Sequence, residues 1–407
     1  MSTISKHPNY DEYHKDHLMC PLLWQHLCVN TDGSLAPCCE LTKFDKPLNP
    51  KESLQVAYNT DKFKDIRRRM LAGETNKHCD RICYSQERTG NISKRLREIK
   101  HYEKKYGVAF SGYESEQGNI KEINYLDFKP SNYCNSKCVM CNNNRSSQYA
   151  LESKKNKGYE GPVLVGGWYE ENKHKIEPLY DNVWRFKING GETTVMPEFE
   201  TIISAVGDAP NTDTHLILNI NNTVDITKYD EHLSKVKRIN LVSSIEGWES
   251  VNEYIRFPGK WDNIYNNLKT FDAWAQTKGK LVECYFGMVI MSLNYQQFPL
   301  TVQKLEQEFP RWGFDIHIIN QPKQLMVKGL TQEQLELGLE RMESVYPTLT
   351  ERTQRKMTHG LNYYRDAVKQ GTDNNTRQML KDYVQYIDNA RNININNYIP
   401  ELQINTG

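Results

Sequence analysis

From residue 122 onward, the sequence alternates between short apolar runs and longer stretches with helical spacing. Strands are predicted at six places: Ile123–Phe128, Arg185–Asn189, His215–Ile220, Arg238–Ile245, Leu281–Met291 and Asp315–Ile319. Helices are predicted between them, at Met196–Val206, Trp261–Gln276 and Phe298–Glu308. Because strands that alternate with helices usually form a parallel sheet covered by those helices, the pattern predicts a parallel, barrel-like α/β core.

The N-terminal flank of this core, residues 1–90, is rich in cysteines and turns. Leu27–Asn30, the Asp32-Gly33 turn and Leu35 are typical of a hairpin. A helix is predicted at Asp61–Leu71, and its Arg67-Arg68-Arg69 run indicates a solvated face, with phosphate or acidic-peptide binding as the alternative. A connecting helix is predicted at residues 85–106 and a linker at residues 107–119.

Beyond residue 320 the strand pattern stops, and helices are predicted at Thr331–Val345 and Asn375–Ile387. We therefore expect four regions, at residues 1–90, 91–119, 120–320 and 321–407.

Charge and apolar patterning exclude several classes of protein. The chain has 52 basic and 51 acidic residues, so its net charge of +1 gives no global signal for nucleic acid. It has no apolar run long enough to span a membrane, and residues 1–17 lack the apolar stretch of a signal peptide. We expect a cytoplasmic protein without a membrane partner.

Nine of the ten cysteines lie between Cys20 and Cys141, and reduced thiols at this density indicate metal binding. Cys134, Cys138 and Cys141 follow the first core strand, spaced by three residues and then two. A cluster held by protein alone takes four thiolates, so three close cysteines leave one iron open to another ligand. A structural zinc site is the alternative, although zinc spacings are usually Cys-x2-Cys pairs and a fourth ligand would be required.

This three-cysteine spacing resembles the signature of the radical S-adenosylmethionine superfamily. The resemblance implies that Cys134, Cys138 and Cys141 are catalytic, and hold a 4Fe-4S cluster whose open iron binds the cofactor's amino and carboxylate groups. Reduction of the cluster would cleave the cofactor to a 5′-deoxyadenosyl radical. Met140 stands where the family often has an aromatic residue near the adenine. The implied fold is a partial (β/α)6, TIM-like barrel.

Three further segments resemble cofactor-binding motifs of the same family. Gly190, Gly191 and Glu192 match a segment that holds the cofactor's amino group, and backbone carbonyls with a carboxylate suit an ammonium. Ser244 lies in a Ser-Ile-Glu-Gly stretch, and Arg256 matches an arginine that contacts the cofactor carboxylate. Asn294 matches a position that bonds the cofactor ribose or backbone. All of them fall at the C-terminal ends of predicted strands, where ligands gather in such barrels.

Four N-terminal cysteines form a second candidate ligand set: Cys20, Cys38, Cys79 and Cys83. The Asp32-Gly33 hairpin would bring Cys20 towards Cys38, and the later pair could complete a four-thiolate shell. The set resembles the auxiliary-cluster (twitch) module of SPASM-type radical enzymes, here placed before the barrel, and implies a second iron–sulfur cluster. Zinc on the same ligands is the alternative, and Cys28 or Cys39 could replace one of the four.

Cys284 stands alone in an apolar strand, at the parity of Phe286 and Met288. It could donate a hydrogen atom to a substrate radical, although a buried inert thiol is the commoner role of such a residue.

Together these features predict a radical S-adenosylmethionine enzyme that abstracts hydrogen from its substrate. The family architecture implies a ribosomally made peptide as substrate and an electron donor such as flavodoxin or ferredoxin. A nucleotide, sugar or small metabolite is the alternative substrate. A non-catalytic zinc or iron–sulfur interaction protein is the alternative from another class; the open cluster position and Gly190–Glu192 argue against it, since a structural site needs neither.

Overall fold

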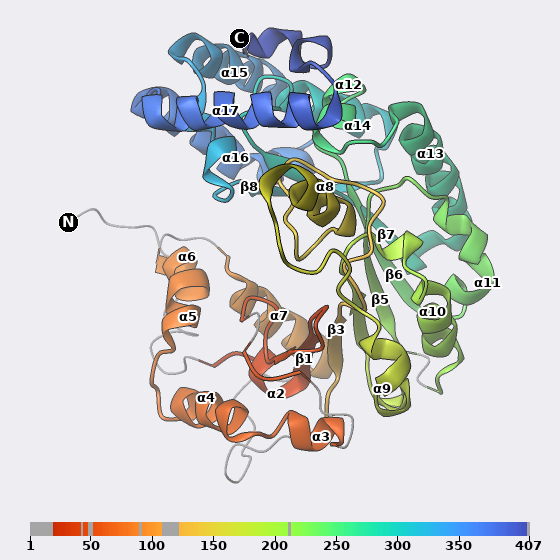
Figure 1. Ribbon diagram of the computed structural model, residues 1–407. Helices are drawn as coiled ribbons and strands as arrows, with labels where there is room; N and C mark the ends of the chain where they lie inside the picture. The colour runs from red at the N-terminus through yellow and green to blue at the C-terminus, as the bar shows by residue number, and fades with distance from the viewer. Residues whose placement is uncertain are drawn as a thin grey trace. The chain divides into compact units, whose positions relative to one another are not determined.

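The computed structural model describes residues 19–41, 44–47, 52–88, 92–107, 122–210 and 213–404 (Figure 1). Its sheet has eight strands in the order β2-β1-β3-β4-β5-β6-β7-β8. They are β1 (His26–Val29), β2 (Leu35–Ala36), β3 (Tyr125–Phe128), β4 (Arg185–Ile188), β5 (His215–Ile220), β6 (Arg238–Ser244), β7 (Val282–Ile290) and β8 (Gly313–Ile318). Apart from β2 the order follows the chain, as in a TIM-like barrel, and the predicted α/β class is confirmed.

The six predicted core strands correspond to β3–β8. The predicted hairpin also forms, because Asn30 donates its backbone N–H to the Ser34 carbonyl at 2.9 Å and Gly33 adopts a φ of +75°. The hairpin extends the core sheet, since β1 pairs in parallel with β3, from His26 beside Tyr125 onward. The neighbours β3–β4, β6–β7 and β7–β8 are parallel as well.

The chain divides into two compact units. The first contains residues 1–131, 166–190 and 201–216, and the second contains residues 132–165, 191–200 and 217–407. Helices of the first unit are α2 (Leu22–Gln25), α3 (Leu54–Ala57), α4 (Asp61–Leu71), α5 (Lys77–Cys79), α6 (Ser85–Arg88), α7 (Lys94–Tyr106) and α9 (Trp168–Ile176). Helices of the second are α8 (Ser147–Lys157), α11 (Asp230–Leu233), α12 (Ser250–Ile255), α13 (Trp261–Lys278), α14 (Phe298–Glu308), α15 (Gln332–Val345), α16 (Glu351–Gln370) and α17 (Asn374–Arg391). Helix α10 (Phe199–Asp208) and strand β5 contribute residues to both units.

In the first unit, α4 has the predicted bounds and buries Phe63, Ile66 and Met70. The prediction of a fully solvated basic face on this helix is wrong for Arg67, which is completely buried. Its guanidinium donates from Nε to the Leu23 carbonyl at 2.7 Å and from Nη2 to the Tyr58 carbonyl at 2.9 Å. The arginine therefore satisfies backbone acceptors that burial would otherwise leave unpaired.

The predicted connecting helix at residues 85–106 is confirmed over Lys94–Tyr106, as α7, but it is not a single helix from residue 85, because α7 begins after Ser93. That residue is extended, and its hydroxyl accepts the Leu96 N–H at 3.2 Å, as an N-cap does. Helix α7 ends at Gly107, whose φ of +71° suits a glycine C-cap. The rest of the predicted linker lies outside the described residues.

In the second unit, β7 alternates between buried and half-buried residues. Helix α16 contacts both β8 and α15 (Figure 1). The rings of Tyr295 and Tyr364 stack with centroids 3.9 Å apart, and Gly338 leaves the room that the Tyr295 ring needs. The predicted helical region beyond residue 320 is thus confirmed. In the part of the chain that the structure describes, no helix is both long and apolar enough to cross a bilayer.

Candidate functional site

The loop that carries Cys134, Cys138 and Cys141 belongs to the second unit and is held by its backbone. Lys137 and Val139, on either side of Cys138, donate their N–H groups to the carbonyls of Phe257 and Ile255 at 2.8 and 2.9 Å. The peptides on either side of Cys138 are therefore tied to the C-terminal end of α12 and to Phe257 just beyond it.

The three predicted thiols influence one another's ionisation. Burial raises the pKa of Cys134, and the charges of Cys138 and Cys141 raise it further. Burial likewise raises the pKa of Cys141 to about 12, with a smaller contribution from Cys138. Such thiols stay protonated until a metal offers positive charge, so metal binding would release their protons.

The Gly190–Glu192 segment meets the cysteine loop directly. Glu192 donates its N–H to the Tyr133 carbonyl at 2.8 Å, one residue before Cys134. A Cβ atom on Gly191 would lie 2.0 Å from that carbonyl oxygen, so only glycine permits this approach. Gly190 adopts a φ of +137°, another conformation that favours glycine.

The Glu192 carboxylate is buried and accepts hydrogen bonds from neutral donors. It accepts the Thr194 hydroxyl at 2.7 Å and the Asn221 N–H at 2.7 Å. Burial nevertheless raises the pKa of Glu192 from 4.5 to about 7, because these hydrogen bonds only partly offset the lost hydration.

Arg256 joins the cysteine loop to a second buried carboxylate. Its Nη2 donates to Glu246 at 2.7 Å, and its Nη1 lies 3.8 Å from the Cys138 sulfur. Glu246 also accepts the Val289 N–H at 2.7 Å. The Arg256 Nε is buried and has no hydrogen-bond partner among the residues that the structure describes. The Arg256 guanidinium thus lies beside the thiol through Nη1, and a guanidinium suits a carboxylate ligand.

The other predicted cofactor residues are placed differently. Asn294 is buried, and its side-chain amide donates hydrogen bonds to the carbonyls of Glu246 and Val289, each at 2.8 Å. Ser244 is half-buried at the end of β6, next to Gly287 of β7, and Met140 is half-buried in the cysteine loop. Contacts of these three residues with a cofactor remain predictions.

The four N-terminal cysteines border one small cavity of the first unit, together with Lys94 and Arg95 at the start of α7. The four are Cys20, Cys38, Cys79 and Cys83. Burial raises the pKa of Cys20, and the charges of Cys83 and Cys79 add to the effect. Four thiols beside two cationic side chains form a donor set that suits a thiolate-ligated, negatively charged metal centre.

The two remaining N-terminal cysteines, Cys28 and Cys39, differ in position. The Cys28 sulfur lies 3.2 Å from Lys129 Nζ, and Cys28 does not border that cavity. Cys39 is hydrogen-bonded to Cys38, which raises the pKa of Cys38. Within the described residues, no three His, Cys, Asp or Glu side chains are already arranged as a metal-ion site, so ligation by either cysteine group is a proposal.

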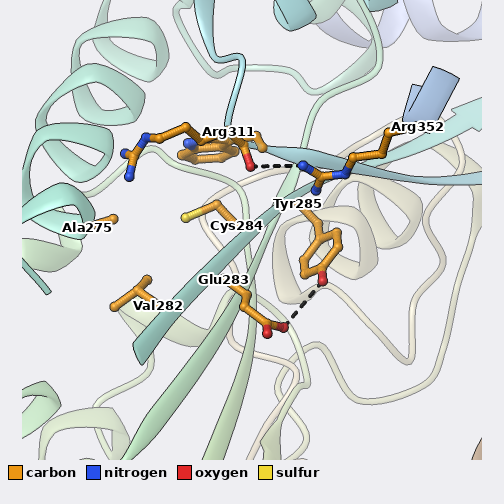
Figure 2. Close-up of a pocket in the computed structure, with 8 residues that line it drawn as sticks. Ala275, Val282, Glu283, Cys284, Tyr285, Arg311 and Arg352 are labelled. Atoms are coloured by element: carbon orange, nitrogen blue, oxygen red, sulfur yellow. Dashed lines mark hydrogen bonds between the residues drawn. The ribbon is translucent and has the colours of Figure 1, made fainter. Parts of the chain in front are cut away.

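A cavity of about 240 Å³ lies at the start of β7, where the Cys284 side chain points towards Ala275 and away from Tyr285 (Figure 2). Burial raises the pKa of Cys284 to about 12. Val289, which bonds Glu246, lies near the opposite end of the same strand. This placement favours an inert thiol rather than a hydrogen donor.

Sequence reasoning missed a polar chain that supports the cysteine loop. The Asn221 amide donates to Asn135 Oδ1 at 2.9 Å and to the Ser136 hydroxyl at 3.0 Å. Asn221 directly follows β5, as Glu192 closely follows β4. Polar residues at the ends of parallel strands were the signal that could have identified it.

Comparisons with known proteins give a limited result. No protein-family model and no curated protein matches the sequence. Among solved structures, the fold is similar to native anSMEcpe with bound AdoMet, at 17% identity and a TM-score of 0.38, over 54% of this chain and 58% of that one. It is also similar to Streptococcus suis SuiB bound to S-adenosylmethionine, at 17% identity and a TM-score of 0.34, over 62% of this chain and 49% of that one. The chain thus spans about half to three fifths of the length of these structures, and similarity at this level does not assign an activity to it.

Proposed function

We propose that this protein is a radical S-adenosylmethionine enzyme whose cluster is held by Cys134, Cys138 and Cys141. The observation that carries the proposal is the position of Cys138, whose sulfur lies 3.8 Å from the guanidinium of Arg256. The Glu192 N–H bonds the same loop from the other side, at Tyr133. Three thiols, a guanidinium and a buried carboxylate therefore occur together in one unit, as a cluster and an amino-acid-bearing cofactor require.

The residues of the chain have distinct roles in this proposal. When bound, the cluster supplies the electron that cleaves S-adenosylmethionine to a 5′-deoxyadenosyl radical, which removes a hydrogen atom from the substrate. Arg256 binds the cofactor carboxylate, and Glu246 orients the guanidinium through its 2.7 Å ion pair. The Gly191 carbonyl and the Glu192 carboxylate receive the cofactor ammonium.

We further propose that Cys20, Cys38, Cys79 and Cys83 hold an auxiliary iron–sulfur centre. The support is their shared cavity with Lys94 and Arg95. Metal analysis separates this centre from zinc on the same thiols. Cys38→Ala should lower the bound iron, whereas Cys28→Ala should not, because the Cys28 thiol lies at Lys129. Equal loss of iron in both variants would contradict the assignment.

A ribosomally made peptide is the proposed substrate, with a flavodoxin- or ferredoxin-type electron donor. The alternatives are a nucleotide, sugar or small metabolite, or a non-catalytic metal-bound interaction protein. Protein that turned over cofactor but left every candidate peptide unchanged would count against the peptide.

The experiment that tests the core proposal is anaerobic reconstitution followed by iron and sulfide counting. Two 4Fe-4S clusters correspond to about eight irons per chain. Cys138→Ala should lose about half of them and should abolish the change that S-adenosylmethionine causes in the electron paramagnetic resonance spectrum of the reduced protein. Cys284→Ala, a buried thiol outside both groups, is the matched control. Zinc in place of iron would refute the proposal.

A further inference from the structure

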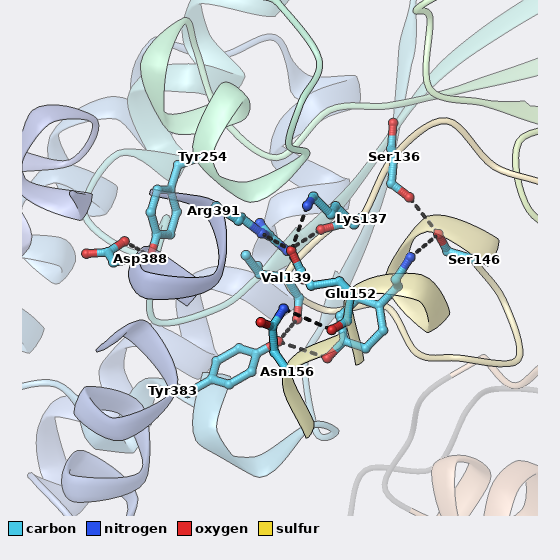
Figure 3. A network of polar contacts seen from close by, with 11 residues as sticks. Ser136, Lys137, Val139, Ser146, Glu152, Asn156, Tyr254, Tyr383, Asp388 and Arg391 are labelled. Atoms are coloured by element: carbon cyan, nitrogen blue, oxygen red, sulfur yellow. Dashed lines mark hydrogen bonds and ion pairs between the residues drawn. The ribbon is translucent and has the colours of Figure 1, made fainter. Parts of the chain in front are cut away.

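Helix α17 in the C-terminal region bonds directly to the cysteine loop, more than 200 residues earlier in the chain. The Tyr383 hydroxyl donates to the Val139 carbonyl at 2.6 Å, and Arg391 Nη2 donates to the Lys137 carbonyl at 2.5 Å (Figure 3). The two carbonyls stand on either side of Cys138 in the sequence. All of these residues belong to the second unit.

The peptides around Cys138 are consequently fixed on both sides. The N–H groups of Lys137 and Val139 bond to Phe257, just after α12, and to Ile255, the last residue of α12, and their carbonyls bond to α17. Four hydrogen bonds therefore set the direction in which the Cys138 side chain leaves the loop. Arg256, whose guanidinium lies beside the Cys138 sulfur, belongs to the same segment after α12.

The Arg391 side chain is itself held by charge. It is completely buried and bonds both carboxylate oxygens of Glu152 on α8, each at 3.1 Å (Figure 3). The Lys137 ammonium lies 2.9 Å from the same carboxylate. A buried ion pair contributes little net stability compared with apolar packing. We therefore assign to this pair the orientation of the Arg391 side chain rather than the stability of the fold.

Helix α17 also has an anchor that does not involve the loop. Tyr254 of α12 donates its hydroxyl to Asp388 at 3.0 Å, and the second Asp388 oxygen accepts the Ile395 N–H at 2.9 Å. Loss of the Tyr383 hydroxyl, which also lies 3.2 Å from the Tyr149 hydroxyl, would thus leave the helix docked while it removes one of the four bonds that hold the loop.

We propose that α17 is a positioning element of the cluster site, in which Tyr383 and Arg391 hold the loop so that the Cys138 thiol faces the cluster. The proposal rests on the proposed function, because it assigns these residues a task at the same site. Both residues act through the backbone of the loop, at the carbonyls of Val139 and Lys137.

Hydrogen–deuterium exchange on the full chain, before any metal is added, tests whether α17 holds the cysteine loop. Tyr383→Phe removes one hydroxyl, and a hydrogen bond worth about 1 kcal/mol corresponds to about fivefold faster exchange at the Lys137 and Val139 amides. Tyr386→Phe is the matched control, since Tyr386 lies on the same helix and its ring packs against that of Tyr383 at 6.2 Å. Equal exchange in the two variants would overturn the proposal.

The reconstituted protein tests the positioning role. Tyr383→Phe should release iron to a chelator about fivefold faster than Tyr386→Phe, and should alter the spectrum of the reduced, cofactor-bound protein. Arg391→Lys should fall between wild type and Arg391→Met, because lysine keeps the charge but not the two-pronged contact. Unchanged release and an unchanged spectrum would overturn the positioning role. If wild-type protein binds no iron while the exchange difference persists, the proposed function fails, and the positioning role fails with it. The contact between α17 and the cysteine loop would still be supported.

Discussion

The buried carboxylate of Glu192 gives a quantitative prediction. Its pKa rises from 4.5 to about 7 on folding because the carboxylate loses its hydration. A carboxyl whose folded pKa is raised contributes stability that is fully present below the unfolded pKa and is lost as the pH rises through the folded pKa. The window therefore runs from about pH 4.5 to about pH 7.

The magnitude follows from the size of the shift. At about 1.4 kcal/mol per pKa unit, the full shift is worth roughly 3.4 kcal/mol. About 2 kcal/mol of this is lost between pH 5.5 and 8, mostly below pH 7, because there the unfolded carboxyl is ionised while the folded one still holds its proton.

The perturbation is Glu192→Gln, which cannot ionise. Any hydrogen bond that glutamine loses lowers stability equally at every pH, so the difference in pH dependence isolates the titration. Equilibrium urea unfolding should show wild type losing about 2 kcal/mol relative to the variant between pH 5.5 and 8. Glu200→Gln, which removes an exposed carboxylate from α10, serves as the control. Parallel profiles of wild type and Glu192→Gln would refute the argument from burial.

Three further predictions concern the same units. Binding of a cofactor ammonium at Glu192 should release about half a proton at pH 7, because the free carboxyl is half ionised at that pH. Calorimetry in buffers of different ionisation enthalpy measures the proton release. A binding enthalpy that does not depend on the buffer would contradict the prediction. Arg256→Met should lower the free energy of unfolding by about 3–5 kcal/mol, because it leaves the buried Glu246 carboxylate without its charged partner. The double variant Arg256→Met with Glu246→Gln should recover most of the loss, and a double variant no more stable than the single one would argue against the pair. Arg67→Met should lower the free energy of unfolding in urea by about 3 kcal/mol, because the buried carbonyls of Leu23 and Tyr58 lose their donor. Arg68 is exposed, so Arg68→Ala should change this free energy by no more than about 0.5 kcal/mol. Equal effects of the two substitutions would contradict the structural role of Arg67.

The sequence predicted those parts of the fold that depend on local periodicity. All six core strands were found because each is an apolar run between helical stretches, and the burial of Cys284 followed from the parity of its strand. The pairing of β1 with β3 could not be predicted, since a four-residue strand carries no mark of its partner. Arg67 was misjudged for a related reason: a basic run does not indicate which member faces buried carbonyls.

The candidate site was predictable only where residue type and spacing carry the signal. The cysteine spacings and the Gly-Gly-Glu segment are visible in the chain, and the structure brings Glu192 and Arg256 to the loop. The contacts of Tyr383 and Arg391 were invisible because they join residues more than 200 positions apart. Tertiary packing alone decides which tyrosine or arginine of a helix reaches a loop.

The most direct test of the central claim is cofactor cleavage by the reconstituted, reduced chain. Wild type and Cys284→Ala should both convert S-adenosylmethionine to 5′-deoxyadenosine, whereas Cys138→Ala should form none. Cleavage that survives in Cys138→Ala, or wild type that holds iron at this loop yet forms no 5′-deoxyadenosine, would contradict the account.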